Sequence, residues 1–140
     1  MDIETIREHC LKKKGVTESL PFGEDSPVYK VMGKIFLIAS IEPPVSINIK
    51  CDPETAVELR ERYNSVIPGY HMNKLHWNTV YLDNTSSDFN DSIPEELILK
   101  WIDDSYELVV EGLRKSRFHT VFSAIFIAVS IFTSVINKFN

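Results

Sequence analysis

The feature that most constrains this chain is an uncharged stretch near its C-terminal end. Residues 118–137 contain no Lys, Arg, Asp or Glu and are dominated by Phe, Ile, Val, Ala and Ser. A helix needs about 20 predominantly apolar residues to cross a bilayer. Arg114, Lys115 and Arg117 precede the stretch, and the positive-inside rule keeps such residues cytoplasmic. The stretch therefore predicts a C-terminal membrane anchor with the rest of the chain facing the cytosol.

A polar stripe within the same stretch supports a second interpretation. Four polar residues recur at near-helical spacing, Ser123, Ser130, Ser134 and Asn137. A helix docked on a soluble domain has the same pattern. Helix propensity does not decide between the two, because β-branched residues form helices poorly in water but are tolerated in lipid. We therefore treat residues 1–116 as one domain and residues 117–140 as a hydrophobic segment, either a membrane anchor or a docked helix.

The composition is that of an ordinary globular protein. With 140 residues, 44% of them hydrophobic and 25% charged, the chain is about one domain long. Cys10 and Cys51 follow no disulfide pattern, and the N-terminus lacks a basic and apolar leader, so we expect a cytoplasmic protein. The formal net charge is −5, and residues 1–117 hold 14 of the 15 basic and all 20 acidic residues. This balance lacks the basic footprint that is usual for nucleic-acid binding.

Hydrophobic periodicity predicts three helices. The first has an apolar stripe and Asp2 as its N-cap; the stripe is Ile3, Ile6, Cys10 and Leu11. The second begins at Asp52 and Pro53, a capping residue followed by proline at the first helical position. The third begins at residues 92–95, which carry the capping-box spacing, and its apolar stripe continues to Val109.

Strands are predicted between these helices, at residues 28–31, 34–40, 46–50 and 77–82. Gly33 supplies the turn of a hairpin between the first two. The separation of helices from strands predicts an α+β fold in two layers, an antiparallel sheet packed against helices. No strand is followed by a glycine-rich phosphate loop, so neither a nucleotide site nor any other cofactor is predicted.

The densest group of polar and aromatic residues lies at residues 68–83. It holds two His, one Lys, two Asn, two Tyr and a Trp, side chains that stack on bases and bond to phosphates or base edges. Strand lysines, namely Lys30, Lys34 and Lys50, add positive charge. This segment is the predicted site.

Several motifs resemble the MmcQ/YjbR family over about residues 1–116. These motifs are Leu20-Pro21-Phe22-Gly23-Glu24-Asp25, Lys34-Ile35-Phe36, Asn48-Ile49-Lys50-Cys51-Asp52-Pro53-Glu54, Pro68-Gly69-Tyr70-His71-Met72-Asn73-Lys74, His76-Trp77-Asn78-Thr79-Val80 and Ser105-Tyr106-Glu107-Leu108-Val109. The resemblance implies the order α-β-β-β-α-β-β-α, similar to type III secretion chaperones and CyaY. The hydrophobic segment after Arg117 is not part of the family pattern.

The resemblance also implies a DNA-binding protein that contacts double-stranded DNA through the 70–78 loop and the strand lysines. The residues placed at that contact surface are Lys30, Lys34, Lys50, His71, Asn73, Lys74, His76 and Asn78. An acidic domain binds DNA only if its cations gather on one face, because affinity depends on the phosphates neutralised locally. In the competing interpretation Tyr70, Trp77 and Tyr81 are core residues and residues 71–74 form a solvated loop.

Other functions were weighed against DNA binding. The chaperone-like fold also suits a protein or peptide partner, which leaves an interaction module without nucleic acid as the alternative. His71 and His76 with Cys51 or Asp52 offer metal-ligand atoms, but their spacing fits no standard signature and no metal is predicted. Cys51 has no activating motif around it. We therefore expect no catalytic residues and a protein that is not an enzyme.

Overall fold

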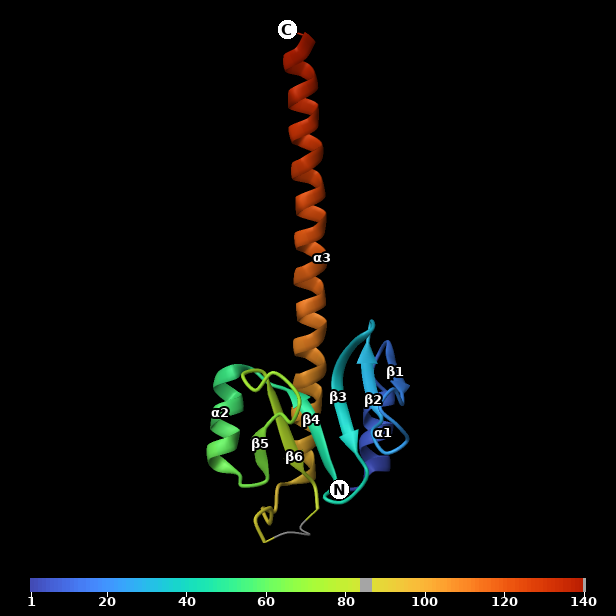
Figure 1. The fold of residues 1–140 in the computed structure, drawn as a ribbon, viewed down its shortest axis with the longest axis vertical. Helices are drawn as coiled ribbons and strands as arrows, with labels where there is room; N and C mark the ends of the chain where they lie inside the picture. Colours follow the sequence, from blue (N-terminus) through green and yellow to red (C-terminus); the bar gives the residue numbers. More distant parts are fainter. Residues whose placement is uncertain (84–86, 140) are drawn as a thin grey trace. The chain divides into compact units, whose positions relative to one another are not determined.

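The computed structural model describes residues 1–83 and 87–139. The chain divides into two compact units, Met1–Val109 and Val110–Asn140, and each is described on its own. The first unit contains all the strands and the first two helices (Figure 1). This division lies a few residues before the boundary at 116 and 117 that the sequence predicts.

The first unit is built on one antiparallel sheet with the strand order β1-β2-β3-β4-β6-β5. The strands are β1 (Val16–Ser19), β2 (Val28–Val31), β3 (Lys34–Ser40), β4 (Ser46–Lys50), β5 (Val66–Pro68) and β6 (Trp77–Tyr81). The predicted α+β class with an antiparallel sheet is confirmed. The predicted order lacks β1, a four-residue edge strand that has no fully buried residue and therefore no hydrophobic signal in the sequence.

Helix α1 (Ile3–Leu11) begins as the sequence predicts, because the Asp2 carboxylate accepts a hydrogen bond from the Thr5 amide at 2.7 Å. Helix α2 (Pro53–Arg62) begins where the sequence predicts, with Asp52 at the N-cap position and the proline in the first turn, but the Asp52 side chain makes no capping hydrogen bond. Helix α3 (Glu95–Phe139) begins after residues 92–94. Its first backbone bonds go to the Pro94 carbonyl, so the helix starts later than the predicted capping box requires.

The helices cover one face of the sheet. Along β6 the side chains alternate, and Asn78 reaches the Ala56 carbonyl of α2. Ile49 and Ile47 of β4 lie opposite Asn78 and Val80, and Val66 of β5 also lies opposite Val80, so these residues point to the same side. Leu37 and Ala39 of β3 lie opposite Ile49 and Ile47 in turn, and all five residues are buried. This helix-covered face is the core of the unit.

A serine of α3 is fitted into this core. The Ser105 hydroxyl donates to the Phe36 carbonyl at 2.6 Å and accepts from the Lys50 amide at 2.8 Å. It therefore holds α3 to β3 and β4 at once. Tyr106 packs its ring edge-on against Phe36, with the centroids 5.5 Å apart. Cys10 of α1 is fully buried in the same core, as its place in the apolar stripe predicts.

In the second unit, Val110–Asn140, the described residues 110–139 continue helix α3. Its large apolar residues are exposed, among them Phe122, Phe126 and Phe132. In the part of the chain that the structure describes, α3 is the one helix long and apolar enough to cross a membrane.

Candidate functional site

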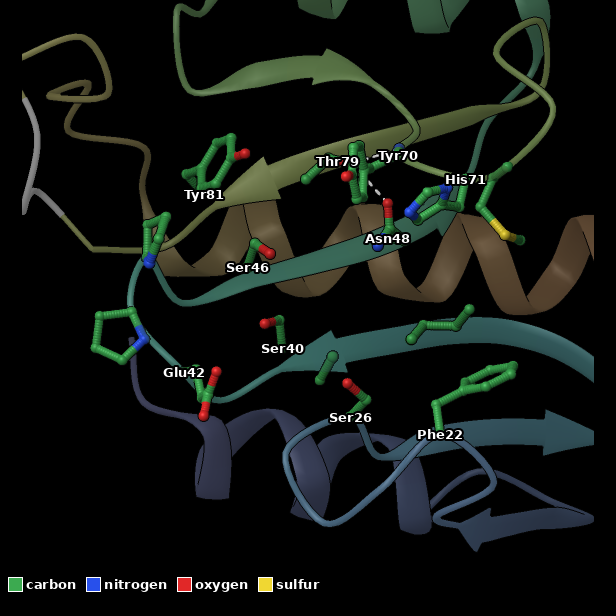
Figure 2. A pocket seen from close by; sticks show the side chains of 15 residues that line it. Phe22, Ser26, Ser40, Glu42, Ser46, Asn48, Tyr70, His71, Thr79 and Tyr81 are labelled. Carbon is green, nitrogen blue, oxygen red and sulfur yellow. Dashed lines mark hydrogen bonds between the residues drawn. The ribbon is translucent and has the colours of Figure 1, made fainter.

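A groove of about 760 Å³ lies on the other face of the sheet, the face without helices (Figure 2). Its lining comes from β3, β4 and β6 and from three loops. We call it the open-face groove. The described residues that line it are Phe22, Ser26, Ile38, Ala39, Ser40, Glu42, Pro43, Pro44, Ser46, Asn48, Tyr70, His71, Met72, Thr79 and Tyr81.

The floor of the groove follows from strand register. Asn48 lies opposite Ile38 on one side and Thr79 on the other, so these three side chains point to the same face. The Thr79 hydroxyl donates to the Asn48 side-chain oxygen at 2.6 Å and accepts from the Tyr70 amide at 3.1 Å. The Asn48 side-chain nitrogen has no hydrogen-bond partner among the described residues. The floor therefore offers an amide donor to a ligand.

The 69–72 loop forms one wall of the groove. Gly69 passes so close to β6 that an added Cβ would lie 2.7 Å from the Trp77 Cβ, which explains the glycine in the Pro68-Gly69 motif. His71 has a φ of 59°, in the left-handed region that costs most residues about 1–2 kcal/mol. The Tyr70 and His71 rings lie with their centroids 4.0 Å apart. The loop thus presents two rings to the groove.

Large apolar side chains at the groove are exposed to solvent. Tyr70 is 69% exposed and Phe22 is 67% exposed, and both line the groove. Among the described lining residues there is one carboxylate, Glu42, and no lysine or arginine. The groove is therefore nearly uncharged, with apolar walls and neutral hydrogen-bonding groups on its floor.

The residues predicted to contact DNA divide into three groups, the last of which is Asn78 alone. Only His71 lines the open-face groove. The strand register places Lys30, Lys34 and Lys50 at one end of the sheet. Lys30 and Lys34 lie next to the β2–β3 turn, and Lys50 pairs with Trp77 at the start of β6. Three more residues precede β6 at that end: Asn73 and Lys74 are exposed and His76 is half-buried.

Asn78 is a correction to the predicted contact surface. Its side chain is completely buried on the helix-covered face. Its oxygen accepts from the Arg60 guanidinium at 2.6 Å, and its nitrogen donates to the Ala56 carbonyl at 3.2 Å. Both ends of the amide are occupied inside the domain, so Asn78 cannot contact a ligand.

The aromatic residues of the same segment have three different environments. Trp77 is buried, as the interpretation of a core residue requires. Tyr81 is half-buried, and its ring stacks on Phe89 with the centroids 4.0 Å apart. Tyr70 is exposed at the groove, so for this residue the core interpretation is wrong.

The cysteines and the metal-ligand residues add no further site. Cys51 is buried, and this burial raises the pKa of its thiol to about 11, so at neutral pH it is not a thiolate nucleophile. Burial likewise raises the pKa of the Cys10 thiol to about 12. Among the described residues no three His, Cys, Asp or Glu side chains gather as metal ligands.

Of the polar residues that form the floor, Thr79 lies within the predicted 68–83 segment, whereas Ser46 and Asn48 lie outside it. Ser46 and Asn48 alternate with buried apolar residues on β4, a strand in the middle of the sheet. A polar stripe on central strands is the available signal, because it marks the face that no helix covers. Phe22 and Glu42 lie in loops, and only the folded chain brings them to the groove.

The fold and the groove define a small α+β domain with one helix-covered and one open sheet face. Residues 11–108 match the family model described as YjbR. The chain belongs to the YjbR family, which confirms the resemblance found in the sequence. An uncharacterised Escherichia coli O157:H7 protein, YbdF, is 39% identical over 113 residues, 80% of this chain and 87% of the relative. The uncharacterised YjbR of Escherichia coli K12 is 30% identical over 118 residues, 84% and 94% of the two chains.

Two solved structures have a similar fold. The crystal structure of the Deinococcus radiodurans protein DR2400, of domain DUF419, superposes with a TM-score of 0.66 at 34% identity and covers 76% of this chain and 77% of its own. A Pseudomonas syringae protein gives a TM-score of 0.63 at 24% identity and covers 77% and 98% of the two chains. The second likeness bears on the fold alone.

Proposed function

We propose that the domain is a non-catalytic binding module whose open-face groove takes a short, uncharged and partly apolar segment of a partner protein. The observation that carries the proposal is the groove itself, a hollow on the helix-free face with two exposed aromatic residues at it. Grooves of about 300–1,000 Å³ are the size that holds a small ligand or a few side chains. Exposed apolar patches on a domain mark interaction sites.

The lining favours an uncharged peptide over other ligands. Phe22, Tyr70 and Met72 offer apolar contact area, and aromatic anchors of this kind dominate the energy of protein interfaces. The free side-chain nitrogen of Asn48 donates to an oxygen such as a backbone carbonyl, while Thr79 holds the amide in place from the other side. A carboxylate-rich or phosphate-rich ligand finds no lysine or arginine among the described lining residues.

The same side chains lack the pairing that catalysis needs. A nucleophilic hydroxyl requires a general base within hydrogen-bond reach. In the described chain the Thr79 hydroxyl is bonded to an amide oxygen and a backbone amide, not to a base. Cys51 is buried in its thiol form. These environments favour binding over chemistry.

DNA binding is the second candidate, and one observation favours it. Lys30, Lys34 and Lys50 come from different parts of the chain to the same end of the sheet, near the loop that holds Lys74. Against it stands the excess of acidic residues in residues 1–117. Binding to phosphates through these lysines would weaken steeply with salt, because each contact releases counterions.

The test uses a chain that ends at Arg117, since the unit Met1–Val109 has its own core and the family model ends at residue 108. Peptides are selected against this chain from a random twelve-residue library and titrated by fluorescence anisotropy at about 50 and 200 mM salt. We expect the Kd to change less than about threefold with salt. Asn48→Ala should weaken binding about tenfold, the loss expected for one hydrogen bond.

Lys74→Glu is the matched control, because Lys74 is exposed and lies outside the groove lining. It should leave peptide binding unchanged. A labelled DNA duplex is titrated beside the peptides. Two results together would contradict the proposal and favour DNA. The first is duplex binding that falls with salt and with Lys74→Glu, and the second is failure to select any peptide whose binding is sensitive to Asn48→Ala.

A further inference from the structure

The second unit carries a segment whose length matches a lipid bilayer. Residues 118–137 are helical throughout and uncharged. At 1.5 Å per residue, 20 helical residues extend about 30 Å, the thickness of the hydrocarbon core. Helix α3 is long and apolar enough to cross a membrane.

Large apolar side chains point to several sides of the helix, not to one narrow stripe. Ile125, Phe126 and Ile127 are consecutive and all exposed, and consecutive helical residues point about 100° apart. A second protein surface packed along one side would leave the others in water. Apolar residues spread over several sides are instead characteristic of a buried or membrane-spanning helix, and a bilayer covers every side at once.

Three hydroxyl groups within the segment are satisfied by the helix itself. Thr120, Ser130 and Thr133 each donate to the carbonyl four residues earlier at 3.0 Å. A polar group without a partner costs several kcal/mol in hydrocarbon, and these internal bonds remove that cost for three of the polar side chains. Of the four polar residues that suggested a docked helix, Ser130 is satisfied in this way.

Charged residues flank the segment unequally. Arg114, Lys115 and Arg117 lie just before it, and Lys138 lies just after it. Basic residues remain on the cytoplasmic side of a membrane. This asymmetry assigns the N-terminal end of the segment to the cytoplasmic side.

We propose that residues 118–137 span a lipid bilayer once, with the unit Met1–Val109 on the cytoplasmic side. The proposal stands on the helix alone and does not depend on the occupant of the open-face groove. Its consequence for the groove is that any partner would be bound by a protein tethered to the membrane.

The experiment expresses the full chain in bacteria and separates membranes by sucrose-gradient flotation after a carbonate wash. Floating membrane vesicles carry an integral protein upward, whereas aggregates sink. We expect the full chain to float. The double variant Phe126→Lys/Ile127→Lys should lose most of its floating fraction, because charges near the middle of the bilayer are costly.

The control places the same two charges at the ends of the segment, in Phe118→Lys/Phe139→Lys. Lysines near a helix end extend their ammonium groups to the interface, so this variant should still float. A full chain that stays soluble, is released by carbonate or sinks as an aggregate would overturn the proposal. So would equal behaviour of the two double variants.

Orientation is tested with a membrane-impermeant maleimide on intact spheroplasts. The native cysteines are buried, so single cysteines at exposed positions, Lys14→Cys and Phe139→Cys, report the two sides. We expect Phe139→Cys to react on intact cells and Lys14→Cys only after lysis. The reverse pattern would overturn the assigned orientation.

Discussion

The two faces of the sheet use the same side chain in opposite ways. Asn78 and Asn48 sit on neighbouring strands, β6 and β4. Asn78 points to the helix-covered face, where Arg60 and Ala56 occupy both ends of its amide. Asn48 points into the open-face groove, where Thr79 holds its oxygen and its nitrogen has no partner within the described chain. The first amide stabilises the fold, whereas the second remains available to a ligand.

This difference separates stability from function within one sheet. Buried polar groups are costly unless they are paired, and on the helix-covered face the polar side chains of Ser105 and Asn78 both have partners. The open face tolerates unpaired donors because solvent reaches them. Substitutions on the two faces should therefore act on different measurements.

The largest expected effect is on the helix-covered face. Asn78→Ala removes two hydrogen bonds, one of them from the charged Arg60, and should lower the free energy of unfolding by about 3 kcal/mol. Asn48→Ala is the counterpart and should cost less than about 1 kcal/mol. Urea denaturation of both variants measures the difference. Equal losses would break the distinction between the faces.

Gly69→Ala should lower the free energy of unfolding by less than Asn78→Ala does, and it should also weaken peptide binding. The new Cβ meets the Trp77 Cβ at 2.7 Å, so the loop that carries Tyr70 and His71 must move. Steric insertion of this kind costs about 1–3 kcal/mol. The variant should unfold at lower urea and also bind the selected peptide more weakly. Unchanged binding would show that the loop is not a wall of the site.

Acidification should lower the free energy of unfolding through a carboxylate on the helix-covered side of the molecule. Partial burial raises the pKa of Asp103, but hydrogen bonds from Lys13 and His9 outweigh this effect and leave the pKa below its ordinary value. A carboxylate with a lowered pKa contributes stability above about pH 4 and loses it as the pH falls below that value.

Because Asp103 is 46% exposed, the contribution is at most about 1 kcal/mol. Asp103→Asn should therefore be slightly less stable at pH 6 and should lose less stability than the native chain on going to about pH 3. Urea unfolding at both pH values checks this. A steeper acid loss in the variant would contradict the assigned direction.

His71→Gly should have the smallest effect on stability and a clear effect on binding. Glycine adopts the φ of 59° at His71 without strain, so the free energy of unfolding should stay the same or rise by up to about 1 kcal/mol. Peptide affinity should fall, because the imidazole leaves the groove. A variant that is destabilised by this change would show that the ring supports the fold instead.

The sequence predicts the core of this fold better than its site. Apolar periodicity placed α1, the central strands and the first turns of α3, because burial imposes that periodicity directly. The short strand β1 has no such signal. Alternation along residues 77–82 places Asn78 and Thr79 on opposite faces of the strand. The sequence does not show which of these faces the helices cover, whereas the position of α2 in the fold does. The groove combines loops distant in sequence, and no local pattern records that contact.

The most direct test of the open-face groove is a map of amide chemical shifts. A nitrogen-15-labelled chain ending at Arg117 is titrated with a selected peptide, and the shifts are assigned by residue. We predict changes concentrated at Ile38, Asn48, Tyr70 and Thr79, and in Asn48→Ala the same extent of change should need about tenfold more peptide. The proposed site would be contradicted by chemical-shift changes centred on Lys30, Lys34 and Lys50. It would also be contradicted by changes on α1 and α2 with no change at the groove residues.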